Sequence, residues 1–370
     1  MENQWECELK KQGIPPGKCQ VKGKDKTKTG TACQITLKYR DGIPYRLISS
    51  AHLSRPEHYF SIYQSGCNMD CRKCHSWHFS QHEDPEGEWM SPDDILVKAE
   101  GYARSVTYEE PRERATSFHA LDLCRGCGAC VQLGVFRTSD SARDGGELFL
   151  RPTDQKGELC PDKLEPHQII LSPQGYGPAR NIVAFTGGDL GCRPEFYASC
   201  AEKIKAKPLS LHILFETNGY GLTPQNLDML QAAGIDAFWL DIKAFEPEVH
   251  RKLTGVANEG ILKLPEEMIK RDFVLEVLSL FITGWVEKDQ LKEIAKILSA
   301  VDKKIPFTIL AFFPEYKMKN VPSPNLDQML SAYEAAKEVG LQHVRLGNIG
   351  VFVKTNRELE TLVSRTGGAI

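Results

Sequence analysis

Short apolar segments alternate with longer segments of helical periodicity through the second half of the chain. The apolar segments are rich in β-branched and aromatic residues, which predicts strands at 182–185, 211–215, 237–240, 273–281 and 307–312. Apolar residues spaced three and four apart predict helices between them, at 194–205, 224–233, 288–299 and 326–339. Further strands are predicted at 59–64 and 343–346. Alternating strands and helices form a parallel sheet, so the pattern predicts an α/β fold.

The strand at 59–64 and the five that follow 179 predict six strand–helix units, which make a partial barrel. The first half of the chain is less regular, although a strand is predicted at 33–39. Residues 79–178 are irregular and rich in Gly, Pro and charge, which indicates an insertion between the first two barrel strands. The predicted parts are an N-terminal extension (1–54), a barrel (55–78 and 179–356), the insertion (79–178) and a C-terminal tail (357–370).

Composition narrows the class of protein. A chain of 370 residues with 41% hydrophobic content can bury a large core, and none of its apolar runs reaches the roughly 18 residues of a membrane span. The N-terminus is polar and acidic, unlike a signal peptide, so we expect a cytoplasmic protein. A net charge of −3 from 46 basic and 49 acidic residues indicates no nucleic-acid partner. Twelve cysteines in a reducing compartment indicate bound metal rather than disulfides.

Three of the cysteines follow the strand at 59–64 directly. Cys67, Cys71 and Cys74 have C-x3-C-x2-C spacing, which gathers three thiolates on one short loop. This set of ligands suits a cubane iron–sulfur cluster in which one iron has no protein ligand. The predicted site therefore has an iron that is open to a further ligand.

With this motif at a strand end, the chain resembles the radical S-adenosylmethionine (radical SAM) superfamily. The resemblance implies that the open iron binds the amino and carboxylate groups of SAM and that an electron from the cluster cleaves SAM to a 5′-deoxyadenosyl radical. It also implies a partial (β/α)6 TIM-like barrel, whose active site lies where the strands end. The residues that follow each predicted strand are therefore the candidates for the site.

Gly187-Gly188-Asp189 follows the second strand and resembles the Gly-Gly-Glu motif that holds the SAM amino group, with Asp in place of Glu. After the third strand, Glu216-Thr217-Asn218-Gly219 resembles the Asp-Thr-Asn-Gly segment of glycyl-radical activases. This resemblance implies SAM contacts by Glu216 and Asn218. A simple turn at Asn218-Gly219 is the alternative.

Asp241 and Lys243 follow the fourth strand and are predicted to share one face, because side chains alternate along a strand. A pair of opposite charges in a barrel mouth can bind a zwitterion, and the spacing resembles the SAM-binding Asp-x-Lys motif of pyruvate formate-lyase activating enzyme relatives. An internal salt bridge is the alternative. Lys73 and Phe313 depart from the family pattern, since an aromatic residue and a His are usual there. His75 follows the third cysteine, where it can serve as a hydrogen-bond donor to the cluster.

A second cysteine group lies in the insertion. Cys124, Cys127 and Cys130 have C-x2-C-x2-C spacing, and Cys160-Pro161 follows about thirty residues later. The group resembles half of a bacterial ferredoxin motif, so we expect a ferredoxin-like insertion with a second [4Fe–4S] cluster that delivers electrons to the first. A structural zinc site is the rival interpretation.

Five cysteines remain outside these two groups. Cys7, Cys19 and Cys33 are widely spaced, which favours ordinary thiols over a further metal site. Cys192 and Cys200 lie in or near a predicted helix and are expected to pack in the core, although Cys192 is close enough to Gly188 to reach the active site.

The resemblance implies an enzyme of the pyruvate formate-lyase-activating-enzyme-like and AmmeMemoRadiSam-like branch, with SAM and iron–sulfur clusters as cofactors. Its expected substrate is a protein or peptide from which the radical abstracts hydrogen, as in a glycyl-radical activase, and reduced ferredoxin or flavodoxin is the expected electron donor. One alternative is the same radical used on a small molecule or on a residue other than glycine. The other alternative is a non-enzymatic electron-transfer protein with two clusters, each bound by four protein ligands.

Overall fold

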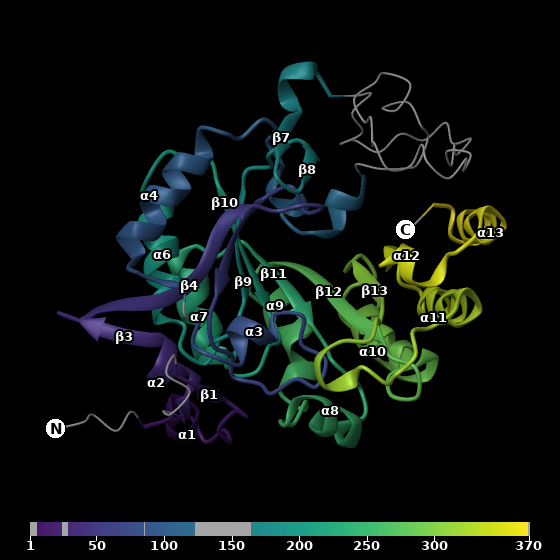
Figure 1. Ribbon diagram of the computed structural model, residues 1–370, viewed down its shortest axis with the longest axis horizontal. Coiled ribbons are helices and arrows are strands. Elements are labelled where there is room, and N and C mark those ends of the chain that lie inside the picture. Colours follow the sequence, from purple (N-terminus) through teal and green to yellow (C-terminus); the bar gives the residue numbers. More distant parts are fainter. Residues whose placement is uncertain (1–5, 24–28, 85, 123–163, 369–370) are drawn as a thin grey trace.

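The computed structural model describes residues 6–23, 29–84, 86–122 and 164–368 (Figure 1). In this part of the chain a ten-stranded sheet has the order β14-β13-β12-β11-β10-β9-β5-β4-β3, and β6 also pairs with β4. From β5 to β14 each strand is parallel to its neighbour, which confirms the predicted α/β fold and all seven predicted strands. These strands are β5 (Phe60–Gln64), β9 (Ile182–Gly187), β10 (His212–Thr217), β11 (Ala237–Asp241), β12 (Val274–Phe281), β13 (Phe307–Ala311) and β14 (Val344–Gly347).

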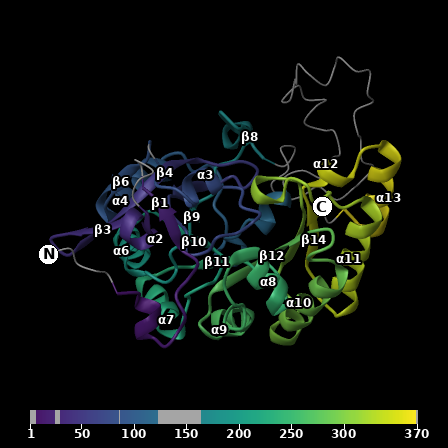
Figure 2. The same ribbon diagram turned by 60° about the horizontal axis from the view of Figure 1, so that its bottom comes forward.

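Helices follow one another along the outside of the curved sheet (Figure 2). The four predicted helices are present, and the main hydrophobic core lies between them and the sheet. A separate small apolar cluster lines the inside and includes Tyr59, Ile182, Ala184 and Leu214. The helices are α3 (Trp77–Ser80), α4 (Pro92–Ala103), α6 (Glu195–Lys205), α7 (Pro224–Ala233), α8 (Pro247–Thr254), α9 (Leu264–Lys270), α10 (Lys288–Val301), α11 (Leu326–Glu338), α12 (Ile349–Phe352) and α13 (Asn356–Thr366).

The N-terminal residues add antiparallel strands to the β5 edge of the sheet. The strand predicted at 33–39 is wrong in its first half, because 32–36 form the helix α2. A capping box explains the difference, since the Thr31 side chain accepts a hydrogen bond from Gln34 N and the Gln34 side chain accepts one from Thr31 N. The N-terminal elements are α1 (Glu8–Lys11), β1 (Gln20–Lys22), β2 (Thr29–Thr31), α2 (Ala32–Thr36), β3 (Leu37–Arg40) and β4 (Ile43–Leu53).

The segment after α3 is more regular than its composition indicates. Residues 79–178 were expected to be irregular, but Pro92–Ala103 form α4, which packs against α6. A capping box of Ser91 and Asp94, with Pro92 at the first helical position, starts this helix. Three short strands also lie here, namely β6 (Glu88–Met90), β7 (Ile170–Ser172) and β8 (Gly175–Gly177). The predicted ferredoxin-like part falls at 123–163, outside the described residues.

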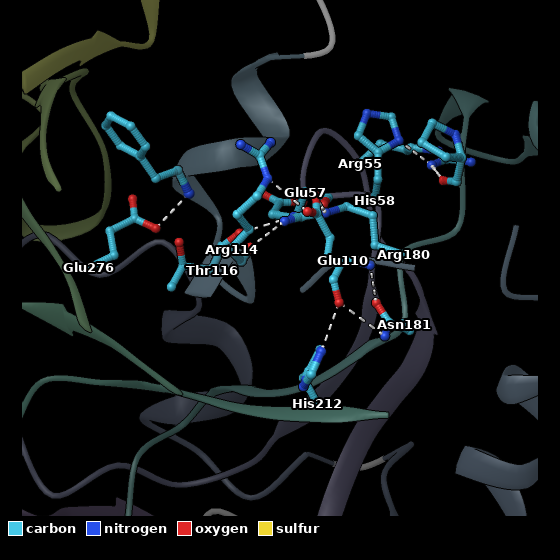
Figure 3. A network of polar contacts seen from close by, with 12 residues as sticks. Arg55, Glu57, His58, Glu110, Arg114, Thr116, Arg180, Asn181, His212 and Glu276 are labelled. Carbon is cyan, nitrogen blue, oxygen red and sulfur yellow. Dashed lines mark hydrogen bonds and ion pairs between the residues drawn. The ribbon is translucent and has the colours of Figure 1, made fainter. Parts of the chain in front are cut away.

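A buried polar network lies at the amino ends of β9 and β10 (Figure 3). The fully buried side chains of Arg180 and Glu110 form an ion pair at 3.0 Å, and Arg180 also donates to the Thr116 carbonyl oxygen. Asn181 Oδ1 accepts from Glu110 N, and His212 Nε2 lies 2.9 Å from the Glu110 carbonyl oxygen. The network attaches the segment around Glu110 to the bottom of the barrel, so the opposite end is the one available for a site.

Among the described helices, none has the length and apolar composition needed to cross a membrane.

Candidate active site

A cavity of about 420 Å³ lies at the carboxyl ends of the parallel strands. It brings together predicted site residues that are far apart in the sequence. Of the predicted cluster and SAM residues within the described part of the chain, only Gly188 is not part of its wall. The predicted residues that line it are Cys67, Cys71, Cys74, Gly187, Asp189, Glu216, Asn218, Asp241 and Lys243.

Backbone hydrogen bonds hold the cysteine loop in place. Asp70 N donates to the Thr254 carbonyl oxygen at 3.0 Å, and Arg72 N donates to the Leu253 carbonyl oxygen at 2.7 Å. Both acceptors lie in the last turn of α8, where carbonyl oxygens have no partner within the helix. The end of α8 therefore positions the residues between the three cysteines.

The three thiols are in a protein environment that disfavours their charged form in the absence of metal. Burial raises the pKa of Cys67 to about 12, and the Asp189 carboxylate adds to this effect. Burial also raises the pKa of Cys71 and Cys74. None of the three forms a disulfide. A bound cation would compensate the charge of the thiolates, as in metal–thiolate sites generally.

The Gly-Gly-Asp segment connects the second barrel strand to the cysteine loop. Gly188 N donates to the Gln64 carbonyl oxygen at 2.7 Å, and a Cβ atom at Gly188 would lie 2.4 Å from the Gly66 carbonyl oxygen. This close approach requires glycine. Asp189 is buried, and its carboxylate accepts from Gly191 N, Asn218 N and the Thr217 hydroxyl at 2.7–2.8 Å. The predicted contact of Asp189 with the SAM amino group stays a prediction.

Asn218 contacts the cysteine loop and also forms a turn. Its Nδ2 donates to Asn68 Oδ1 at 2.8 Å and lies 3.6 Å from Cys67 Sγ. Its Oδ1 accepts from Tyr220 N at 2.9 Å, and Gly219 has a positive φ of 77°. The turn considered as the alternative is thus present, and the side chain lines the cavity as well.

Glu216 lies in the cavity wall and is hydrogen-bonded to two hydroxyl groups. Its carboxyl group accepts hydrogen bonds from the Tyr59 hydroxyl at 2.7 Å and the Thr186 hydroxyl at 2.5 Å. Burial raises the pKa of Glu216 to about 8, and the negative charge of Glu57 also raises it. The two hydrogen bonds lower the pKa but do not outweigh burial. Burial therefore favours the protonated form of Glu216 more than it is favoured in an exposed glutamate.

Asp241 and Lys243 both line the cavity wall and form an ion pair with each other, which is the alternative given for this pair. Burial disfavours the lysine charge, but the Asp241 carboxylate and the Cys71 thiolate outweigh it and hold the pKa of Lys243 above its usual value. Lys243 donates to Asp241 Oδ2, while Asp241 Oδ1 is buried without a hydrogen-bond partner. An internal salt bridge therefore exists, and it leaves one buried acceptor of a residue in the cavity wall unsatisfied.

The two departures from the family pattern meet at one edge of the cavity. The Lys73 ammonium group lies 3.6 Å from the centre of the Phe313 ring and is paired with Glu315. His75 Nδ1 lies 3.4 Å from Glu315, and its side chain is 81% exposed. Lys73 is thus held by a carboxylate and an aromatic ring.

The cavity wall also contains polar residues that the sequence did not predict, among them Glu57 and Trp239. Trp239 Nε1 is buried without a hydrogen-bond partner. Because Trp239 precedes Asp241 by two positions in β11, strand alternation could have placed it on the same face. Glu57 lies before the first residue of β5, so strand alternation could not predict that its side chain lines the cavity.

The predicted ligands of the second cluster, Cys124, Cys127, Cys130 and Cys160, lie outside the described residues.

Comparison with known proteins finds related sequences. The family model of the radical SAM superfamily matches residues 161–298. A candidate glycyl-radical enzyme activating enzyme of Methanocaldococcus jannaschii is 31% identical over 134 residues, which are 35% of this chain and 50% of that protein. The pyruvate formate-lyase 1-activating enzyme of Escherichia coli K12 is 24% identical over 161 residues, 40% of this chain and 64% of that enzyme.

The 4-hydroxyphenylacetate decarboxylase activating enzyme of Clostridium scatologenes is 23% identical over 233 residues, 58% of this chain and 64% of that enzyme. The chain thus spans between half and two thirds of the length of these three relatives.

Proposed function

The chain belongs to the radical SAM superfamily, in its pyruvate formate-lyase-activating-enzyme-like branch, and on this basis we propose that it cleaves SAM reductively and abstracts hydrogen from a protein substrate. A [4Fe–4S] cluster bound by Cys67, Cys71 and Cys74 supplies the electron. The activity resembles that of a glycyl-radical activase, and the names of the three relatives support this proposal.

One observation carries the proposal: three cysteines share a cavity with a charge pair that has an unsatisfied acceptor. Cys67, Cys71 and Cys74 are the only cysteines among the described residues that line it. Three thiolates leave one iron of a cubane without a protein ligand. A two-cluster electron carrier would need a fourth protein ligand at this loop.

The cavity residues fit a zwitterionic ligand. Asp241 Oδ1 is a free acceptor for an ammonium group, and Lys243 offers positive charge for a carboxylate. Trp239 Nε1 is a buried donor without a partner. In the proposed site these groups orient SAM against the cysteine loop, while Asn218 holds Asn68 and faces Cys67.

The test is dithionite-driven formation of 5′-deoxyadenosine from SAM by anaerobically reconstituted protein. Cys71→Ala should abolish the product, because the loop would lose one of its three ligands. Cys200→Ala is the matched control, since this buried cysteine lies on α6, away from the cavity wall, and we expect it to keep full activity. Product formation by Cys71→Ala at the wild-type rate would refute the assignment.

We further propose that Cys124, Cys127, Cys130 and Cys160 hold a second [4Fe–4S] cluster that passes electrons from reduced ferredoxin or flavodoxin to the first. The spacing of the four cysteines is the support for it. Cys127→Ala should lower the iron content by about four atoms per chain. Loss of about one zinc and no iron would identify a zinc site instead.

A further inference from the structure

Four cysteines outside both predicted clusters come together beside the barrel. Cys7 precedes α1, Cys19 precedes β1, Cys33 lies in α2 and Cys192 follows β9. All four are free thiols, and all four are partly buried against the main hydrophobic core. In the sequence, the last of them is separated from the other three by more than 150 residues.

Backbone pairing brings Cys19 and Cys33 close together. β1 and β2 are antiparallel with Gln20 opposite Thr31, so Cys19 stands across from Ala32, the residue before Cys33. Ala32 N donates to the Cys19 carbonyl oxygen at 2.8 Å. The Thr31 hydroxyl lies 3.1 Å from Cys33 Sγ. The start of α2 thus holds Cys33 next to Cys19.

Contacts of neighbouring residues place the segment around Cys7 next to the loop that contains Cys192. Arg193 follows Cys192 and Glu8 follows Cys7, and these two residues form an ion pair with 3.9 Å between Arg193 Nη1 and Glu8 Oε1. Gly221 packs so closely that a Cβ atom there would lie 2.6 Å from Cys192 Cβ, and the adjacent Tyr220 donates to the Pro15 carbonyl oxygen at 2.8 Å. These contacts fasten the N-terminal segment onto the loop after β9.

The thiols interact electrostatically with one another. Burial raises the pKa of Cys192, and the negative charges of Cys33, Cys19 and Cys7 raise it further. Burial and the charges of Cys33 and Cys7 likewise raise the pKa of Cys19, although the backbone N–H groups of Ala32 and Cys19 oppose the shift. Asp189 raises the pKa of both Cys192 and Cys67, so the four-cysteine group and the cysteine loop lie near the same carboxylate.

We propose that Cys7, Cys19, Cys33 and Cys192 are the ligands of a further metal centre with four thiolate ligands. Thiolates select zinc and iron–sulfur clusters, and four cysteines complete the ligand set of either. The positive charge of Arg193 lies near Cys33 and compensates part of the negative charge of such a centre. The centre fastens the N-terminal segment to the barrel, next to the loop that contains Asp189.

The absence of a ready single-ion site bears on which metal binds. Among the described residues, no three His, Cys, Asp or Glu side chains already surround a point where one ion would bind, and this holds for Cys67, Cys71 and Cys74 too. In an iron–sulfur cluster each thiolate binds a different iron, so its ligands stand further apart than those of a single ion. Metal analysis distinguishes the two centres.

The experiment compares the metal content of three full-length proteins after anaerobic reconstitution with iron, sulfide and zinc. The double variant Cys33→Ser/Cys192→Ser should lose metal relative to the wild type: about four iron and four sulfide for a [4Fe–4S] cluster, or about one zinc. Cys200→Ser should keep the wild-type content, because Cys200 is a buried cysteine outside the group. The measured quantity is the difference in metal content between each variant and the wild type. It therefore does not depend on metal bound at the cysteine loop or in the insertion, or on SAM cleavage.

Equal metal content in the double variant and the wild type would overturn the proposal and return the four cysteines to packing roles. A general loss of fold would remove all metal at once, so Cys7→Ser serves as a second variant. Cys7 flanks the four-residue helix α1, outside the parallel sheet. We expect Cys7→Ser to lose the same metal while the iron of the other sites remains, and an unchanged metal content in it would also count against the centre.

Discussion

Individual polar atoms decide what the cavity can bind. Asp241 uses one carboxylate oxygen for Lys243 and leaves the other buried without a partner. An unsatisfied buried acceptor costs about 1–3 kcal/mol, so a ligand that donates to it gains binding energy. Asp189, in contrast, already accepts three hydrogen bonds from the protein.

Asp241→Asn should weaken SAM binding at least about tenfold, which is about 1.4 kcal/mol, because the acceptor for the ammonium group loses its charge. Equilibrium binding of SAM to the reconstituted protein measures the change. Asp228→Asn is the control, since Asp228 is an exposed residue of α7 that pairs with Arg271. Equal affinity in both variants would make the Asp241–Lys243 pair a purely structural salt bridge.

Glu216 should make stability depend on pH. Its folded pKa of about 8 lies above the ordinary value of about 4.3, so the folded state holds an extra proton between these limits. This contribution is present below pH 4.3 and is lost as the pH rises through 8. In Glu216→Gln the decline in unfolding free energy from pH 5 to 8 should be shallower, by up to about 1.4 kcal/mol per pH unit.

Urea unfolding at pH 5, 6.5 and 8 measures this slope. Glu338→Gln, which changes an exposed carboxylate on α11, should keep the wild-type slope over this range. A wild-type slope in Glu216→Gln would show that Glu216 is ionised in the folded protein.

At the scale of elements, the ends of strands and helices hold the site together. The last turn of α8 accepts hydrogen bonds from the cysteine loop, and the loop after β9 packs on Gly66. These elements are well packed, so a small change in one of them displaces the loop that carries the thiols.

Gly188→Ala should reduce cluster binding, because the added Cβ atom would lie 2.4 Å from the Gly66 carbonyl oxygen and the loop must move. Overpacking of this kind costs about 1–3 kcal/mol. Gly260→Ala is the control, since a Cβ atom there has no neighbour within 4 Å. Iron counts after reconstitution test the prediction, and equal iron in the two variants would contradict it.

For the whole molecule, the buried network in Figure 3 closes one end of the barrel and leaves the other for chemistry. It connects the segment before η1 (Arg112–Arg114) with the starts of β9 and β10 through Glu110 and Arg180. The site and this network therefore occupy opposite ends of the same parallel strands.

Glu110→Ala should lower the free energy of unfolding by about 3–5 kcal/mol, because it leaves the Arg180 guanidinium buried without its carboxylate. Glu248→Ala breaks an exposed pair with Arg251 and should cost about 0–1 kcal/mol. Chemical denaturation of the two variants side by side checks this. A similar loss in both would mean that the buried network contributes little to stability.

The sequence by itself determined the parallel sheet, the main helices and the cysteine loop. Their signals are local: the periodicity of apolar residues at 182–185 or 288–299 and the spacing of Cys67, Cys71 and Cys74 lie within short segments. Strand alternation was enough to place Asp241 and Lys243 on one face. At 33–39 the local signal failed, because the capping box at Thr31 and Gln34 favoured a helix over the β-branched pattern.

Only the tertiary structure decided which distant residues meet. Nothing in the chain near Glu57 indicates that it shares a cavity with Glu216. Nor does the sequence near Asp189 indicate that its carboxylate accepts hydrogen bonds from Thr217 and Asn218. In the sequence Cys7, Cys19 and Cys33 are widely spaced and far from Cys192. In the folded protein the loop after β9 places Cys192 near the other three thiols. The physical reason is that burial, pKa and hydrogen bonding depend on contacts between segments, and chain folding, not sequence spacing, sets those contacts.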